Sequence, residues 1–439
     1  MSTESAELLA DLVGRARKAG AESSDAVLVR GTSLSVTRRH GQTEELERSE
    51  NQDLSLRVFL GHQAATVSAT DLNPANFDRL VERAIAMARV VPADPYAGLA
   101  ETMAPPEAID LELDDGSEPS AETLIARAQE AEDAAASVEG VTNTEGGSAG
   151  FGRNVLVLAT SAGFVGVQPV SSHSISAVAL AGSGVDMQRD YDYSSTVHFA
   201  DLDDAVKIGR SAGERAVKRM NPIRPKTGKY PVIFDPRVAS SIIGHAVGAA
   251  NGASVARGTS LFKDKMGERI FAAGISIIDD PRRVRGLRSR VWDGEGTPTR
   301  RMAIIEDGIL RAWLLDGRSA RQLKLTSTGN AGRGSPTGSN LYMTPGTLSP
   351  AELMADIKEG IYVTELMGGG MNGVTGDYSR GAAGFMIRDG QLAEPIAEIT
   401  IAGHGLEMFL HVTPANDLIF KRGTDAPTLR IEGLTIAGA

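Results

Sequence analysis

The chain has 439 residues and 41% of them are hydrophobic, which is typical of a soluble globular protein with about three domains. Its 45 Lys and Arg against 56 Asp and Glu leave a net charge of −11, and this acidity disfavours nucleic acid or an anionic membrane as a partner. The absence of cysteine excludes disulfides, thiolate-bound zinc, iron–sulfur clusters and a cysteine nucleophile from this chain.

The amino-terminal residues are acidic and lack the basic and apolar regions of a secretory signal, so a cytoplasmic protein is predicted. The longest stretch without a formal charge lies between Arg153 and Asp186, where Pro169 and several glycines and serines are unsuited to a lipid bilayer. We therefore expect no membrane partner, and we interpret this stretch as consecutive buried strands.

Two successive blocks of sequence combine helices with strands. In the first block, apolar residues at helical spacing predict helices over about 4–19 and 75–90, with strands between them. The predicted strands are 25–29, 33–37, 54–60 and 64–68. In the second block, Ser120 is a predicted helix N-cap, strands are expected from 140 to about 198, and a helix follows over 202–220.

The third block is richer in glycine and turns, and its short predicted strands include 230–234, 275–279, 303–306, 385–388 and 429–431. The expected fold class is α+β. Two helix/antiparallel-strand modules form the amino-terminal region, separately or as one composite domain, and a β-rich carboxyl-terminal domain with a few helices follows. A proline-rich, acidic linker over 91–120 and a turn at Asn221 predict domains at residues 1–105, 106–222 and 223–439.

Two glycine-rich motifs match catalytic or cofactor patterns, but their context favours neither. Gly146–Gly150 fits G-x-S-x-G around Ser148, yet a strand-like run follows it where a nucleophile elbow needs a helix, so an ordinary tight turn is predicted. Gly368–Gly373 fits G-x-G-x-x-G, but the residues after it are loop-like and lack the helix whose N-terminus binds a pyrophosphate.

One group of residues offers an alternative metal site. His404, Glu407 and His411 are spaced at i, i+3 and i+7, and a helix would place all three on one face. Residues 399–403 look like a strand that ends in a turn, however, so the preferred interpretation is that no metal binds there.

Residues 235–252 predict a helix of small residues, with Asp235 as its N-cap and Pro236 at its first position. Ala246 and Gly248 would let another backbone or a ligand approach closely. An alanine-rich packing helix is the alternative interpretation.

Polar residues in three further segments are candidate contacts for a peptide or a partner protein. Five arginines between 282 and 290 form a basic patch in an acidic chain, and arginine binds carboxylates in a bidentate manner. A solvated surface paired with acids elsewhere is the alternative. The turn-rich segments 326–340 and 367–384 are typical of mobile or ligand-binding regions. The candidate contacts are Arg288, Arg290, Asn330, Arg333, Asn340, Asp377 and Arg380.

The run Phe234-Asp-Pro-Arg-Val-Ala-Ser-Ser-Ile-Ile-Gly-His-Ala-Val-Gly-Ala resembles the TldD/PmbA family of metallopeptidases, on its PmbA (TldE) branch. Further matches to this family are Ala256-Arg-Gly-Thr-Ser-Leu-Phe, Ser327-Thr-Gly-Asn-Ala-Gly-Arg and Ser379-Arg-Gly-Ala-Ala-Gly-Phe. These motifs are dense from about Lys229 to the carboxyl terminus, and the first two blocks agree with the family in layout.

The resemblance also implies which residues are missing. The TldD branch carries a helical H-E-x-x-x-H, whose histidines hold zinc and whose glutamate can act as a base toward a bound water. Laying this chain over that motif puts Gly244 at the first histidine, His245 at the glutamate and Ala249 at the second histidine. The cysteine that serves as a further ligand is also absent. The expectation is therefore no catalytic residue, no metal and no other cofactor.

A non-catalytic subunit of a TldD/PmbA-type metallopeptidase is the function that the resemblance implies. Such a subunit pairs with a TldD-like catalytic subunit as a heterodimer, or forms a homodimer, and encloses unfolded peptides for proteolysis. One alternative is a peptidase or hydrolase active in its own right, with a different site such as His404, Glu407 and His411. Another is a binding or modulator protein, because the family has been described as modulating DNA gyrase, although the acidic charge gives this no support.

Overall fold

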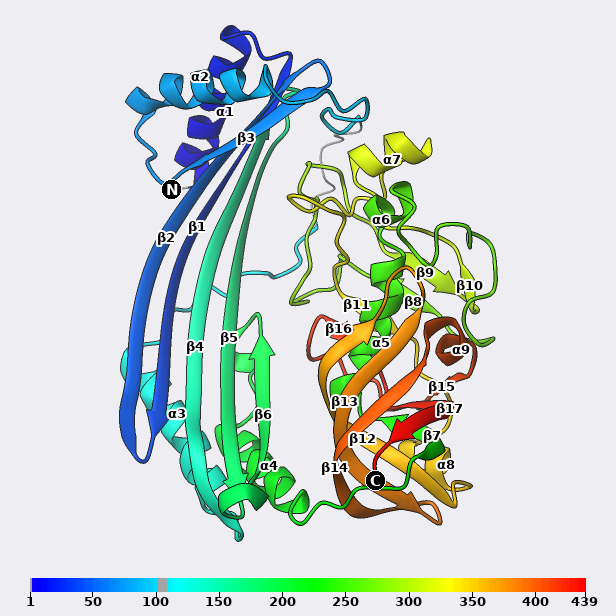
Figure 1. Cartoon of the computed structure of the whole chain (residues 1–439). Helices are drawn as coiled ribbons and strands as arrows, with labels where there is room; N and C mark the ends of the chain where they lie inside the picture. Colours follow the sequence, from blue (N-terminus) through cyan, green and yellow to red (C-terminus); the bar gives the residue numbers. More distant parts are fainter. Residues whose placement is uncertain (1, 102–108) are drawn as a thin grey trace.

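The computed structural model describes residues 2–101 and 109–439, in which a long sheet with helices on its outer face stands opposite a β-rich carboxyl-terminal half (Figure 1). This arrangement confirms the predicted α+β class, with a β-rich carboxyl-terminal region. The predicted boundary between residues 105 and 106 lies outside the described residues.

One continuous antiparallel sheet joins the first two blocks of sequence, in the strand order β3-β2-β1-β4-β5-β6. Its strands are β1 (Ser23–Arg39), β2 (Gln42–Leu60), β3 (Gln63–Ala69), β4 (Val141–Thr160), β5 (Val165–Ala181) and β6 (Gln188–Thr196). The join is the pairing of β1 with β4, which runs from Asp25 opposite Thr160 to Arg38 opposite Gly147. The two helix/strand modules therefore share one sheet.

Strands β1 and β2 are much longer than the sequence pattern predicts, and one predicted turn is wrong. The expected strands 25–29 and 33–37 are parts of the single strand β1. Gly146–Gly150 forms no tight turn, because these residues lie inside β4. Gly147 serves helix packing instead, since a Cβ there would lie 2.1 Å from the backbone oxygen of Ala128.

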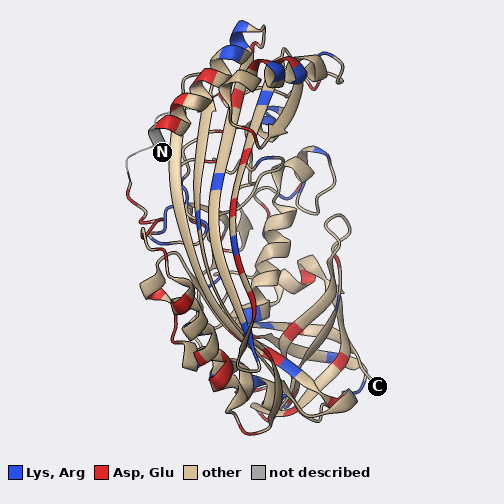
Figure 2. Ribbon diagram, turned by 90° about the vertical axis from the view of Figure 1, so that its left-hand side faces the viewer, with Lys and Arg blue, Asp and Glu red and all other residues tan. Residues whose placement is uncertain are grey.

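Helices cover the two ends of the outer face of this sheet (Figure 2), and the segment around Leu113 and Asp115 crosses it between them, where the Ser171 backbone N–H of β5 donates to the Leu113 oxygen. Helices α1 (Ser2–Lys18) and α2 (Phe77–Ala88) cover one end, and α3 (Ala121–Ala136) and α4 (Ala205–Lys218) cover the other. The predicted N-cap is confirmed, because the Ser120 hydroxyl accepts a hydrogen bond from the Thr123 backbone N–H. The short 3-10 turns are η1 (Pro74–Asn76), η2 (Gly184–Asp186) and η3 (Phe199–Asp201).

Successive side chains of β1 point to opposite faces of the sheet. Leu28 packs under α1 and α2, and Leu34 packs under α3. Val27 points the other way and packs with Trp292 of the carboxyl-terminal half. Because side chains alternate along a strand, the odd-numbered residues of β1 face that half of the molecule.

The carboxyl-terminal half contains two sheets with helix α5 (Pro236–Ala249) packed against both. The five-stranded sheet consists of β10 (Ile309–Leu310), β9 (Met302–Glu306), β8 (Ile277–Asp279), β11 (Leu341–Met343) and β16 (Thr424–Asp425). The six-stranded sheet consists of β14 (Gln391–His404), β13 (Asp377–Arg388), β12 (Glu359–Met371), β7 (Gly228–Phe234), β17 (Leu429–Ala437) and β15 (Val412–Pro414). Since β14 also pairs with β17, five strands of this second sheet close on themselves.

Short helices complete this half: α6 (Gly252–Ala256), α7 (Gly317–Leu323), α8 (Pro350–Met354) and α9 (Gly405–Leu410). The segment 367–384, expected to be turn-rich, is instead mostly the hairpin of β12 and β13. Among the residues that the structure describes, no helix is both long and apolar enough to span a membrane.

Candidate functional site

Helix α5 carries the positions that the metallopeptidase motif would occupy. Its start agrees with the sequence pattern, because Asp235 is the N-cap, its carboxylate accepts from the Arg237 backbone N–H at 2.9 Å, and Pro236 follows it. Ile242, Ile243 and Ala246 are buried in the core between the two sheets. The opposite side of the helix is free of close neighbours, since a Cβ at Gly244 or Gly248 would meet nothing within 4 Å.

The three motif positions offer little to a metal ion. Gly244 has no side chain, and Ala249 is buried in the core. The half-buried His245 lies edge-on to Tyr378 of β13, with ring centroids 5.7 Å apart, and its Nε2 has no hydrogen-bond partner in the described part of the chain. Burial lowers the pKa of His245, and the nearby positive charge of Arg380 lowers it further.

The donor set here does not fit zinc. A stable zinc site needs three or four nitrogen, oxygen or sulfur ligands, and α5 supplies one imidazole beside a guanidinium that repels cations. Across residues 2–101 and 109–439, no three His, Asp or Glu residues are grouped so that they could hold a metal ion.

The alternative set His404, Glu407 and His411 is not brought together. His404 ends β14 and its Nε2 donates to the backbone oxygen of Thr375 at 2.9 Å. His411 follows α9, and its Nδ1 donates to the backbone oxygen of Glu407 at 2.8 Å. Each imidazole is therefore held by a local backbone oxygen, and the three side chains share no common centre.

A cavity of about 240 Å³ lies beside the amino-terminal half of α5, where the two halves of the molecule meet. Its walls come from β6, the end of α4, α5, β12 and β13. The lining residues include Asp190, Arg219, Arg237, Ser241, Thr364, Glu365 and Arg380. Of these, only Arg380 is among the contacts that the sequence predicts.

Ion pairs hold most of the charges around this cavity. Arg237 Nη1 donates to Asp190 Oδ1 at 2.7 Å, and Arg219 pairs with both Asp190 and Glu365. Arg380 differs, because its Nε donates only to the backbone oxygen of Gly368, at 3.0 Å, and no carboxylate in the described part of the chain pairs with it. Within residues 2–101 and 109–439, the guanidinium of Arg380 is thus without a counterion.

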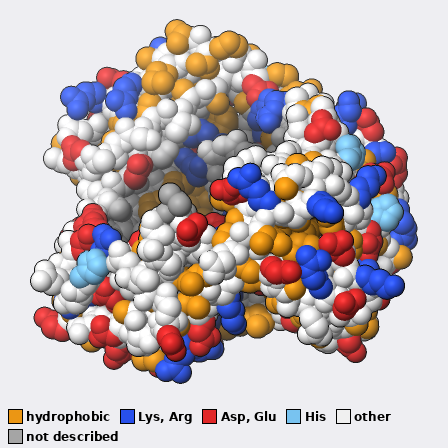
Figure 3. All heavy atoms as spheres, turned by 60° about the horizontal axis from the view of Figure 1, so that its bottom comes forward, with side chains coloured by type: hydrophobic (Ala, Val, Ile, Leu, Met, Phe, Trp, Pro, Cys, Tyr) orange, Lys and Arg blue, Asp and Glu red, His pale blue; other side chains and the backbone are white. Residues whose placement is uncertain are grey.

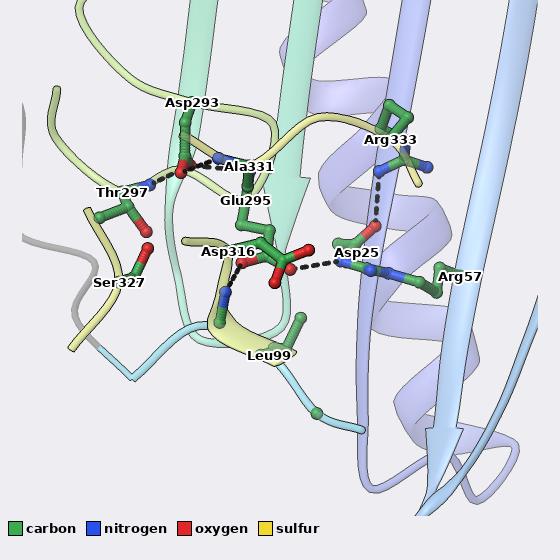
Figure 4. Close-up of polar contacts among 12 residues, drawn as sticks. Asp25, Arg57, Leu99, Asp293, Glu295, Thr297, Asp316, Ser327, Ala331 and Arg333 are labelled. Atoms are coloured by element: carbon green, nitrogen blue, oxygen red, sulfur yellow. Dashed lines mark hydrogen bonds and ion pairs between the residues drawn. The ribbon is translucent and has the colours of Figure 1, made fainter. Parts of the chain in front are cut away.

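A second polar network ties the sheet to the carboxyl-terminal half (Figure 4). Asp25 of β1 accepts from Arg57 Nε of β2 at 2.8 Å and from Arg333 Nη1 at 3.1 Å. Glu295 lies 3.8 Å from Arg57, and burial raises the pKa of Glu295 although this guanidinium opposes the shift. The predicted contact Arg333 therefore joins the two halves of the molecule.

Most of the other predicted contacts are engaged within the carboxyl-terminal half. Asn330 Nδ2 donates to Asp279 at 2.6 Å, and Asn340 Nδ2 donates to Ser289 at 2.8 Å, and both asparagines are buried. The remaining three contact backbone or hydroxyl oxygens: Arg288 reaches Thr424, Arg290 reaches the backbone of Thr337, and Asp377 accepts from Thr375.

The molecule is hollowed between its two halves (Figure 3). A cavity of about 510 Å³ lies against the inner face of the sheet, lined there by Gly31, Gly150 and Ser174 and from the other side by Leu287. Glycine and serine leave this part of the sheet without bulky side chains, so its backbone is close to the open space.

Family models match almost the whole chain. Residues 24–88 match the PmbA/TldA metallopeptidase domain 1, residues 114–220 its central domain, and residues 227–438 its C-terminal domain. The chain belongs to the PmbA/TldD metallopeptidase family. The predicted family is thereby confirmed.

Individual proteins are similar to this chain over nearly its whole length. Metalloprotease PmbA of Escherichia coli O157:H7 is 36% identical over an alignment of 439 residues, which covers 98% of this chain and 96% of that protein. A protein of Bacteroides thetaiotaomicron named as a candidate modulator of DNA gyrase has a TM-score of 0.91 at 26% identity, with 99% and 98% of the two chains covered. TldE of Thermococcus kodakarensis shares the fold, with a TM-score of 0.88 at 20% identity and coverage of 98% and 100%.

Sequence reasoning did not find the residues that surround Arg380 in the cavity. Asp190 and Arg219 lie in the second block of sequence, and Arg237, Thr364 and Glu365 lie in the third. No motif or spacing links them, because the interface between the two halves brings them together.

Proposed function

We propose that this chain is a non-catalytic subunit of a PmbA/TldD-type metallopeptidase. The observation that carries the proposal is the chemistry of α5, where glycine, histidine and alanine occupy the three motif positions and an arginine lies beside the histidine. A water molecule activated for peptide hydrolysis needs a metal or a base. The single half-buried imidazole of His245 cannot hold a metal alone, and its lowered pKa makes it a weaker base, with no carboxylate among the described residues to orient it.

The working form that we propose is a heterodimer with a TldD-like catalytic subunit in the cytoplasm, with a homodimer when that subunit is absent. Its substrate is an unfolded peptide, which this chain helps to enclose. The hollow between the sheet and the carboxyl-terminal half supports this role, since an extended chain needs an open, weakly obstructed channel. The net charge of −11 argues against nucleic acid as the partner.

The experiment compares the chain alone with the chain mixed with a TldD-like subunit of the same organism. Zinc content is measured by mass spectrometry, and cleavage is measured on an unfolded peptide. We expect no stoichiometric zinc and no cleavage from the chain alone, and zinc with cleavage from the mixture. Stoichiometric zinc together with cleavage by the lone chain would overturn the proposal.

The variant His404→Ala tests the main alternative, a peptidase that is active in its own right. If the chain is a peptidase in its own right through His404, then His404→Ala abolishes cleavage by the lone protein. If the proposal holds, this variant and the unaltered chain are equally inactive alone. Co-purification on the tagged chain then asks whether a TldD-like protein or an unrelated one is retained.

A further inference from the structure

Three consecutive glycines in β12 place the side chain of Arg380. Gly368, Gly369 and Gly370 have φ angles of +55°, +41° and +154°, which other residues rarely adopt, and they form a bulge opposite β13. A Cβ at Gly369 would lie 2.1 Å from the backbone oxygen of Ser379, so only glycine fits. The bulge turns the Gly368 oxygen toward Arg380 Nε. The glycines of the G-x-G-x-x-G motif therefore hold the side chain of Arg380 in place through the Gly368 backbone oxygen.

The other guanidinium groups that line the cavity already have carboxylate partners. Arg189 pairs with Glu145 at 2.9 Å, Arg237 pairs with Asp190, and Arg219 pairs with Glu365. Arg380 alone among the lining arginines has no counterion in the described residues. The cavity therefore has a positive charge that an anionic ligand can balance.

Three unpartnered polar atoms lie in the cavity wall or near Arg380. Thr364 lines the cavity, and its buried Oγ1 has no hydrogen-bond partner among the residues that the structure describes. His245 Nε2 and Tyr378 Oη lie outside the cavity lining but are also buried without a partner among the described residues, and the charge of Arg380 reaches both rings. Tyr378 is 2% exposed, and burial raises its pKa to about 12, so its hydroxyl remains a donor at neutral pH. Buried polar groups without partners are rare in native proteins and call for a ligand or water.

We propose that this cavity binds a carboxylate, and specifically the terminal carboxylate of an extended peptide. The planar fork of arginine matches a carboxylate in a bidentate manner, and a hydroxyl such as that of Thr364 can donate a further bond. A volume of about 240 Å³ admits an end group but not a folded partner. The peptide as ligand rests on the proposed function, whereas the preference for a carboxylate rests on Arg380 alone.

The test measures binding of two fluorescent peptides of identical unfolded sequence, one with a free terminal carboxylate and one with a terminal amide. The lone chain is used with EDTA present, so that neither zinc nor a catalytic subunit affects the result. We expect the free carboxylate to bind about tenfold or more tightly, since a hydrogen-bonded charge contributes at least this factor. Arg380→Gln should remove this preference and leave the binding of the amide unchanged.

The matched control is Arg388→Gln, on the same strand, where the exposed Arg388 pairs with Glu359 and Glu394 away from the cavity. It should keep the full preference for the carboxylate. Circular dichroism establishes that each variant is folded, and Arg380→Lys, which keeps the charge without the fork, should retain only part of the preference. Excess acetate should compete with the peptide if a simple carboxylate suffices.

Two results would overturn the proposal. Equal binding of the carboxylate and the amide by the unaltered chain would show that the cavity does not recognise a peptide end. Equal loss of both peptides in Arg380→Gln would show that Arg380 acts only on the structure of the protein. Either result leaves the zinc and cleavage test of the proposed function untouched, so the two failures are distinguishable.

Discussion

Arg237 of α5 and Asp190 of β6 form an ion pair across the interface between the two halves of the molecule. Nη1 and Oδ1 are 2.7 Å apart, and the two side chains are 8% and 3% exposed. Burial works against the charge of Arg237, but the hydrogen bond and the charge of Asp190 outweigh it and raise the pKa of the guanidinium. Arg219 shares the same carboxylate at 3.4 Å.

Replacing the carboxylate of Asp190 should weaken the interface between the two halves and lower the free energy of unfolding. Asp190→Asn leaves two buried guanidinium groups with one anion fewer, and removing one partner of a buried pair typically costs about 3–5 kcal/mol. Urea unfolding measures the loss. The control is Glu145→Gln, whose exposed pair with Arg189 contributes at most about 1 kcal/mol. Equal losses in the two variants would contradict a special role for Asp190.

Alanine at two neighbouring positions of the glycine bulge in β12 should destabilise the protein to different extents. Gly368→Ala strains the backbone only through its positive φ, at a cost of about 1–3 kcal/mol. Gly369→Ala adds a clash with the Ser379 carbonyl and should destabilise the protein further. Thermal unfolding compares the two variants, and an equally stable Gly369→Ala would show that the bulge can rearrange.

A pH dependence is expected from Asp115, in the segment that crosses the outer face of the sheet. Burial disfavours its charge, but hydrogen bonds from the Phe199 and Ser117 backbone N–H groups and the Ser117 hydroxyl, together with His173, hold its pKa well below the usual value. A lowered pKa in the folded state stabilises the protein above the unfolded pKa of about 3.9, and this contribution is lost as the pH falls.

Asp115→Asn should therefore destabilise the protein at pH 7 by about 1–3 kcal/mol, the typical effect of leaving buried donors unsatisfied. The difference from the unaltered chain should shrink as the pH falls below about 4. Unfolding curves at several pH values measure it, with the exposed Asp186→Asn as control. A difference that stays constant with pH would rule out the charge of Asp115 as its cause.

Trp292 is the apolar anchor between the two halves. It is 5% exposed, packs edge-on to Phe164 with ring centroids 5.6 Å apart, and lies so close to Gly166 that a Cβ there would be 2.7 Å from its ring. Trp292→Ala should cost about 3–5 kcal/mol and speed hydrogen exchange in β4 and β5. Ile419→Ala, at a residue that is 71% exposed, is the control and should have little effect.

Local structure was predictable wherever a few neighbouring residues decide it. Ser120 and Asp235 cap their helices as their spacing predicts, because an N-cap bonds to backbone within three residues. Strand length was not predictable for β1 and β4, since their middle residues are glycine, serine and asparagine and pair only because the opposite strand continues. The wrong turn at Gly146–Gly150 has the same origin, because the contact that explains Gly147 comes from a helix about twenty residues away in sequence.

The sequence by itself determined what chemistry α5 can offer, because no fold can supply a ligand atom that glycine and alanine lack. It also determined the family, through motifs that the whole chain retains. Only the tertiary structure decided that Asp190 pairs with Arg237 while Arg380 has no counterion in the described part of the chain, although both are arginines beside polar residues in the sequence. The reason is physical: the charge state of a cavity depends on which carboxylates lie within a few ångströms, and these come from strands and helices far apart along the chain.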